Sequence, residues 1–202
     1  MLLGDYMLSI KNNINNINIV NKSKFISFLF KINNIDDINN ILNCLRSEYK
    51  DSTHICYGYI INGIEKSFDD GEPRNSAGKP ILESLKKNKL NFILAVVIRY
   101  YGGTKLGIGN LTRTYKNCIS ELIKSSEIIE LIEYKNISIS INYSLERIIN
   151  SILNNIEYSK IYNEKIEYNL NADDNLIDNL NNIDGVSLIV NNTIYIEKPI
   201  TK

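Results

Sequence analysis

The stretch NFILAVVIRYYGGTKLGIGNLTRTY, residues 91–115, decides the fold of the first half of the chain. Residues 92–98 within it are all apolar, a pattern typical of a strand that is covered on both faces. Glycines recur through residues 102–109, and apolar residues then return at helical spacing, which predicts a helix from about 110 to 124. A buried strand, a glycine-rich loop and an amphipathic helix therefore form the predicted centre of the domain. The predicted helix buries Leu111, Tyr115, Cys118, Ile119 and Leu122.

Further strands and helices are predicted on the N-terminal side of this centre. The Asn62-Gly63 pair tolerates positive φ and predicts a tight turn between two strands. Pro80 suits the first turn of a helix, because its missing N–H costs nothing there. The predicted elements are a strand at 25–32, a helix with Asp36 and Asp37 in its first turn, strands at 54–61 and 65–68, and a helix beginning at Pro80.

A second pattern starts after Tyr134-Lys135-Asn136, which we interpret as the division between two domains, residues 1–134 and 135–202. The second pattern has the order βαββαβ, which is that of a ferredoxin-like split βαβ domain. Its predicted elements are a strand at 137–141, a helix at 145–153, strands at 159–163 and 166–170, a helix capped by Asp173 or Asp174, and a hairpin at 186–196 that turns at Asn191-Asn192. The fold class is therefore predicted to be α+β with two domains.

Composition and charge narrow the class of protein. With 44% hydrophobic and 23% charged residues and a mean hydropathy of −0.17, the 202-residue chain is typical of soluble globular proteins. The longest apolar run is too short to span a bilayer, and Asp5 stands where a signal peptide has positive charge, so we expect a cytoplasmic protein without membrane contact. Three widely spaced cysteines support neither a disulfide framework nor a zinc cluster, and no cofactor is expected.

Glycine and positive charge are concentrated in residues 69–116. This window holds six of the ten glycines, nine basic residues and four acidic residues, so it carries a net charge of +5 in a chain that is neutral overall. Such local charge favours phosphate-bearing partners, although a solvated basic face explains it as well. The glycine spacings fit neither a P-loop nor a Rossmann fingerprint, because Pro80 follows Lys79 and Thr112 replaces the third glycine.

Few residues in the chain could carry chemistry. His54 and Cys56 lie two apart on a predicted strand and so point to the same face, which permits either a thiolate–imidazole pair or ordinary packing. His54 with Asp69 and Asp70 could form a mixed metal site, but no metal-ligand ladder supports one. The acids of residues 69–73 are expected to organise their loop, with the carboxylates of Asp69 and Asp70 bonding backbone amides and pairing with Arg99 or Lys79.

Four ordered motifs give the chain a resemblance to the YigZ/IMPACT family. They are KSKF at 22–25, HIC at 54–56, SFDDGEPRNSAGKP at 67–80 and VVIRYYGGTKLGIGNLTRTY at 96–115, which together cover most of residues 20–125. The chain departs from the family pattern at Phe68, at Asn75, where the family often has glycine, and at Asn110, where a third loop glycine is common. The resemblance implies an N-terminal α/β sandwich like those of a small-subunit ribosomal protein and elongation factor G domain IV, followed by a ferredoxin-like domain.

The same resemblance implies a function linked to translation. Eukaryotic IMPACT proteins carry an additional RWD domain and regulate translation through the pathway controlling an initiation-factor kinase, whereas this chain resembles the short bacterial form. We therefore expect a non-enzymatic regulatory protein that binds RNA or the ribosome, with a protein partner possible. The expected binding residues are Lys79, Arg99, Lys105, Arg113, Gly102, Gly103, Gly107 and Gly109.

Two other readings of the sequence stay open. In the first, the protein is a small hydrolase that uses His54, Cys56 and the acidic loop 69–72. In the second, it is a protein-interaction scaffold whose glycines only shape a surface. In the leading interpretation the chain has no catalytic or metal-binding residues, and Asp69, Asp70, Gly71, Glu72 and Pro73 organise their loop.

Overall fold

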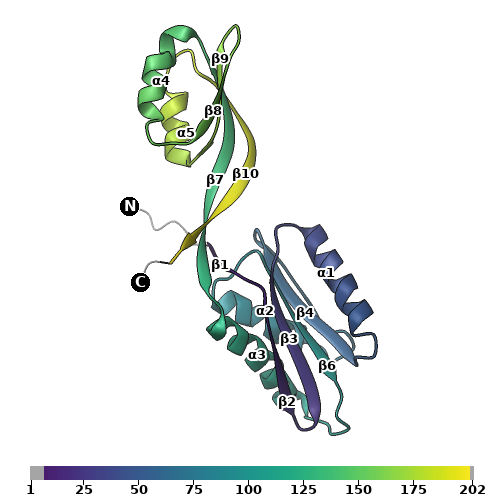
Figure 1. The fold of residues 1–202 in the computed structure, drawn as a ribbon. Helices are drawn as coiled ribbons and strands as arrows, with labels where there is room; N and C mark the ends of the chain where they lie inside the picture. The colour runs from purple at the N-terminus through teal and green to yellow at the C-terminus, as the bar shows by residue number, and fades with distance from the viewer. Residues whose placement is uncertain (1–6, 201–202) are drawn as a thin grey trace. The chain divides into compact units, whose positions relative to one another are not determined.

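The chain has a mixed α/β fold, seen in a computed structural model that describes residues 7–200. Contacts within the chain divide it into two compact units between Glu130 and Leu131, with Pro199 returning to the first (Figure 1). We call these the N-terminal unit and the C-terminal unit.

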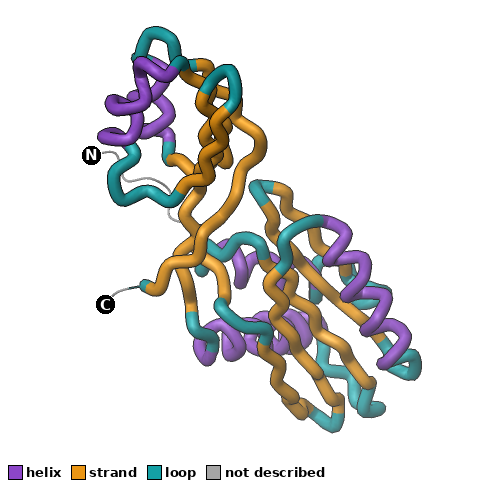
Figure 2. Tube along the Cα trace, turned by 45° about the horizontal axis from the view of Figure 1, so that its top comes forward, coloured by secondary structure: helices purple, strands orange, loops and turns teal. Residues whose placement is uncertain are grey.

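The N-terminal unit is built on a five-stranded antiparallel sheet in the order β2-β3-β6-β4-β5. Its strands are drawn in orange in Figure 2. The central strand β6 is buried at every position except its last residue, which confirms the buried strand predicted at 92–98. The strands are β2 (Ile14–Val20), β3 (Ser23–Lys31), β6 (Ile93–Tyr100), β4 (His54–Ile61) and β5 (Ile64–Phe68).

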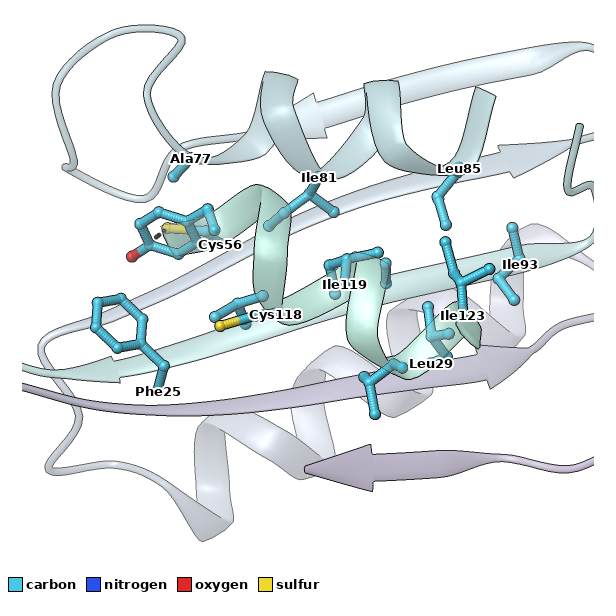
Figure 3. Packing of buried hydrophobic residues seen from close by; sticks show 14 of the residues in the cluster. Phe25, Leu29, Cys56, Ala77, Ile81, Leu85, Ile93, Cys118, Ile119 and Ile123 are labelled. Carbon is cyan, nitrogen blue, oxygen red and sulfur yellow. Dashed lines mark hydrogen bonds between the residues drawn. The ribbon is translucent and has the colours of Figure 1, made fainter. Parts of the chain in front are cut away.

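Helices cover both faces of this sheet. On one face, α2 (Gly78–Lys87) and α3 (Ile108–Ser125) enclose the main core, part of which Figure 3 shows. On the other face lies α1 (Ile35–Glu48) (Figure 1). Helix α1 buries Ile38, Leu42 and Leu45, and the side chain of Asn34 at its start accepts a hydrogen bond from the backbone N–H of Asp37. The three helices confirm the predictions from apolar spacing, and the five residues expected to be buried in α3 are buried.

Two strands at the N-terminal end were not predicted. They are β1 (Met7–Ile10), which neighbours β7, and β2, whose sequence INNINIV pairs with β3 from Ile14–Leu29 to Val20–Ser23. Asparagine has a low strand propensity, and β2 has no fully buried side chain. Neither propensity nor a continuous apolar run in the sequence therefore predicts β2.

The C-terminal unit has the predicted element order βαββαβ and a sheet in the order β10-β7-β9-β8. Asp173 caps the second helix by accepting from the backbone N–H of Leu176 at 2.8 Å, as predicted. The elements are β7 (Ile128–Ile141), η1 (Tyr143–Leu145), α4 (Glu146–Ile152), β8 (Tyr158–Tyr162), β9 (Ile166–Ala172), α5 (Asp174–Asn181) and β10 (Ser187–Pro199).

One turn prediction in this half is wrong. The hairpin expected at Asn191-Asn192 is a single 13-residue strand, β10, because the Asn191 amide donates across to Asn136 Oδ1 and Ser138 Oγ, each at 2.9 Å. The side chain of Asn191 thus bonds across strands, whereas the Asn-Asn pair in the sequence suggests a turn. Residues 134–136, which we expect to divide the two domains, lie inside β7, where Lys135 is in register with Ala172.

Candidate functional site

The loop between β5 and α2 is organised by Asp69. Its Oδ1 accepts the backbone N–H groups of Ala77 at 3.0 Å and Gly78 at 2.8 Å, and its Oδ2 accepts that of Asn75 at 2.7 Å. Asn75 adopts a φ of 62°, the left-handed conformation that asparagine tolerates better than most residues. One carboxylate therefore fixes both the loop and the start of α2.

Asp70 ties the same loop to β4. Its Oδ2 accepts from the backbone N–H of Ile55 at 2.6 Å, and its carbonyl oxygen lies 2.7 Å from Nδ1 of His54. A carbonyl can only accept a hydrogen bond, so Nδ1 carries a hydrogen and donates it to this oxygen. Nε2 of His54 lies 3.9 Å from Oε2 of Glu72, the next acid along the loop.

Glu72 lies at the centre of a buried polar network. Its Oε1 accepts from Nη1 of Arg99 at 2.6 Å and from the hydroxyl of Tyr115 at 2.8 Å. Arg99 and Glu72 are 5% and 8% exposed, and the guanidinium carbon lies 5.4 Å from the ring centroid of Phe25. Burial raises the pKa of Tyr115 far above its usual value, so the phenol stays a donor to the carboxylate.

Arg99 thus pairs with Glu72, where the sequence suggested Asp69 or Asp70 as its partner. The reason is geometric, because the carboxylates of Asp69 and Asp70 are occupied by backbone N–H groups. Lys79, the other cation expected to pair with these acids, lies on the exposed side of α2, 4.0 Å from Glu83.

The loop after β6 packs against the start of β3. The backbone N–H of Gly102 donates to Oγ of Ser23 at 3.1 Å, and a Cβ on Gly102 would lie 2.0 Å from the carbonyl carbon of Lys22. Only glycine fits such an approach of two backbones. Arg99 Nη2 lies 3.4 Å from the same Ser23 hydroxyl, so the loop is connected to the buried network.

A pocket of about 320 Å³ opens beside this network. Its lining combines the Glu72–Arg99 pair, the loop that follows β6 and the start of α3. At the start of α3, Gly107 has a φ of 74°, and no side chain within residues 7–200 caps the helix. Uncapped N–H groups at a helix N-terminus favour anions. The lining residues are Glu72, Pro73, Arg99, Tyr101, Lys105, Leu106, Gly107, Ile108 and Leu111.

The four expected cations do not form one continuous site. Arg99 and Lys105 meet at the pocket, but Arg99 is buried and paired, while Lys105 is exposed. Arg113 is exposed on α3, one helical turn beyond Gly109, and is not part of the lining. Lys79 stands on α2, also outside the lining, as do Gly102, Gly103 and Gly109.

His54 and Cys56 point to the same side of β4, but Cys56 lies in the core. Its side chain is fully buried, and its thiol donates to the carbonyl of Asp69 at 3.0 Å. Burial raises the pKa of Cys56 well above its usual value, so the thiol stays protonated. Cys56 therefore cannot act as the thiolate of a nucleophilic pair in this conformation.

This arrangement predicts the reactivity of the three thiols. Cys44 is exposed, whereas Cys56 and Cys118 are buried, and burial raises the pKa of Cys118 to about 12. A disulfide reagent such as Ellman's reagent should therefore release one equivalent of chromophore from the native protein at pH 8 and three in denaturant. Cys44→Ser should abolish the native reaction, and rapid labelling of that variant would contradict the burial of Cys56.

Neither a metal cluster nor a membrane span emerges from the described part of the chain. Residues 7–200 contain no group of three or more histidine, cysteine, aspartate or glutamate side chains suited to hold a metal ion. No helix among those residues has the length and apolar character to cross a membrane.

Three residues of the site were not singled out by the sequence. Tyr115 bridges Glu72 and Cys56, Tyr101 lines the pocket, and Ser23 joins β3 to the loop at Gly102. Tyr115 was expected only as a core residue, since apolar spacing marks burial and not the partner of a hydroxyl. Tyr101 and Ser23 lie inside the motifs at 96–115 and 22–25. Their position in these motifs is the sequence feature that could have identified them as site residues.

Known proteins are similar to this chain in sequence and in fold. Residues 21–123, a little over half of the chain, match the family model described as the Impact N-terminal domain. The chain is 35% identical over 132 residues to the IMPACT family member YvyE of Bacillus subtilis, covering 64% of this chain and 59% of YvyE. It is 36% identical over 85 residues to the IMPACT family member YigZ of Escherichia coli, covering 40% of this chain and 42% of YigZ. The chain thus spans about half the length of the curated relatives that it matches.

Solved structures provide a comparison of the fold alone. The crystal structure of a hypothetical protein superposes with a TM-score of 0.68 at 21% identity and covers 94% of this chain and 99% of that one. The two-domain translational regulator Yih1 gives a TM-score of 0.33 at 16% identity over 62% of this chain and 52% of Yih1, which is too low to support an argument. From the match of its N-terminal half and the motifs at 22–25, 54–56, 67–80 and 96–115, the chain belongs to the IMPACT family.

Proposed function

We propose that this chain is a non-enzymatic cytoplasmic regulator linked to translation, and that it binds RNA or the ribosome through its N-terminal unit. The observation that carries the proposal is the position of Lys105. It is exposed at the pocket where the loop after β6 meets the uncapped start of α3, so a cation and backbone N–H groups converge on one place. Phosphate groups are recognised by such a combination.

Charge in the site supports an anionic ligand. Glu72 is neutralised by Arg99 through a contact of 2.6 Å, so Lys105 and the helix N-terminus leave the pocket with a positive excess. Arg113 and Lys116 continue the exposed positive charge along α3, where a phosphate backbone could follow.

The hydrolase alternative has less support. It requires Cys56 as a nucleophile, and the Cys56 thiol is buried, protonated and bonded to a carbonyl. His54 Nε2 lies 3.9 Å from Oε2 of Glu72, but the described residues place no activated nucleophile next to it. No observation specific to a protein-interaction scaffold favours that reading.

The same proposal includes the two domain types. The C-terminal unit combines the element order βαββαβ with the strand order β10-β7-β9-β8, which supports a ferredoxin-like domain. For the N-terminal unit, the likeness to a small-subunit ribosomal protein and elongation factor G domain IV rests on the family resemblance. We propose residues 1–134 and 135–202 as these domains, with β7 passing through the division.

Removing single cations tests the RNA proposal. Lys105→Ala and Arg113→Ala should each weaken binding of a fluorescein-labelled single-stranded RNA and reduce the slope of log affinity against log salt by about 0.7 per lost phosphate contact. Binding is measured by fluorescence anisotropy at several salt concentrations. Lys165→Ala removes an exposed lysine from the C-terminal unit and should change neither quantity. Affinities and slopes equal to those of the unmutated protein in both variants would reject this face as the phosphate site.

A further inference from the structure

An exposed aromatic side chain stands at the edge of the pocket. Tyr101 is 44% exposed, and its ring centroid lies 5.4 Å from the guanidinium carbon of Arg99. Its backbone N–H donates to Oγ1 of Thr53 at 2.9 Å, which holds the residue in place. A fixed, half-exposed aromatic ring supported by a guanidinium group has the features of a platform on which a base stacks.

Arg99 provides a second and independent indication of a ligand. Arg99 lines the pocket, is 95% buried given its 5% exposure, and its Nε has no hydrogen-bond partner among residues 7–200. A buried donor without a partner costs free energy, and such a donor is rare in folded proteins. Arg99, a lining residue of the pocket, thus keeps one donor unused among the described residues.

The size and apolar character of the pocket limit the ligand. A volume of about 320 Å³ is at the lower end of the range of roughly 300–1,000 Å³ that is usual for small-molecule sites. Leu106, Ile108 and Leu111 supply apolar walls, and Ile108 is 64% exposed. One base could enter such a pocket. The bases of an A-form duplex could not, because they are stacked inside the helix.

From these observations we infer that the pocket holds one unstacked nucleotide of single-stranded RNA, with the base against Tyr101 and the phosphate at Lys105 and the start of α3. This inference rests on the proposed function and adds the form of RNA that is bound. The cations on α3 would contact the backbone of either form, whereas the pocket accepts only a base that is free of pairing.

Substitution of Tyr101 tests the inference with the full-length chain. The probes are a fluorescein-labelled 12-nucleotide oligouridylate and a labelled 12-base-pair RNA duplex, both titrated at constant salt. Tyr101→Ala should weaken binding of the single strand by about 5- to 100-fold and leave duplex binding within about twofold, since base–aromatic stacking is lost only where a base is exposed. Tyr101→Phe keeps the ring and should keep the affinity.

A matched control and a second measurement complete the test. Tyr143→Ala removes an aromatic side chain that is 51% exposed in the C-terminal unit, and it should change neither affinity. The unmutated protein irradiated with an oligomer containing 4-thiouridine should cross-link at a residue lining the pocket, a readout that does not depend on the folding of a variant. Cross-links only elsewhere, or equal losses of both RNAs in Tyr101→Ala, would overturn the nucleotide pocket and leave RNA binding intact. If the unmutated protein binds neither RNA, the RNA-binding part of the proposed function fails as well.

Discussion

Replacing Glu72 by alanine should lower the free energy of unfolding of the N-terminal unit by about 3–5 kcal/mol. The variant leaves the Arg99 guanidinium buried with no counter-charge, and it also removes the acceptor of the Tyr115 hydroxyl. Arg99 cannot turn easily toward water, because it is packed against the rings of Phe25 and Tyr101. The cost comes from the isolated charge more than from the lost bond.

Urea unfolding in a Cys44→Ser background, followed by thiol labelling, measures this effect in the N-terminal unit. Cys56 and Cys118 both lie in the N-terminal unit and become reactive only when it opens, so their labelling reports on that unit alone. Glu83→Ala, which removes an exposed carboxylate 4.0 Å from Lys79, should stay within about 0.5 kcal/mol. The double variant Glu72→Leu/Arg99→Met should regain most of the loss. A cost below about 1 kcal/mol for Glu72→Ala would show that the pair is not coupled to folding.

Asp69→Ala should cost about 3 kcal/mol, the second largest effect that we expect. It deprives three backbone N–H groups of their acceptor, and two of these, on Ala77 and Gly78, lie in a partly buried environment at the start of α2. Water can replace the carboxylate at the exposed Asn75 but less readily at the other two.

The same thiol-reporter assay distinguishes the role of the charge from that of the oxygen atoms. Asp69→Asn retains one acceptor oxygen and should lose roughly half as much free energy as Asp69→Ala. The exposed variant Glu83→Ala again serves as the reference. An unchanged stability of Asp69→Ala, together with a loss of RNA binding, would move Asp69 from organising the loop to contacting the ligand.

Much of the fold could be predicted because burial leaves a periodic pattern. The strand at 54–61 is found as β4 with the same bounds, and the apolar run 92–98 marks β6. The failures involve asparagine, which occurs throughout β2 and at the middle of β10. Asparagine can serve in a turn and can also bond across strands, so only the neighbouring strand decides between these roles.

The candidate site was harder to predict because its members come from distant segments. The sequence identifies Arg99 as unusual in an apolar strand. It cannot show that the carboxylate of Glu72, 27 residues away, is available to pair with Arg99, while those of Asp69 and Asp70 bond backbone N–H groups. Lys105 and Arg113 are similar exposed cations in the sequence. Only the fold places Lys105 at the pocket and Arg113 outside it.

The free edge of the N-terminal sheet at β2 has a consequence for the behaviour of the protein at high concentration. Among the described residues β2 pairs with β3 alone, and it exposes Ile17 and Ile19 at 53% and 76% without a lysine, a glutamate or a proline along its length. The opposite edge, β5, carries Glu65 and Lys66, charges of the kind that oppose pairing with a second chain. Intermolecular sheet growth, and with it aggregation, should therefore begin at β2.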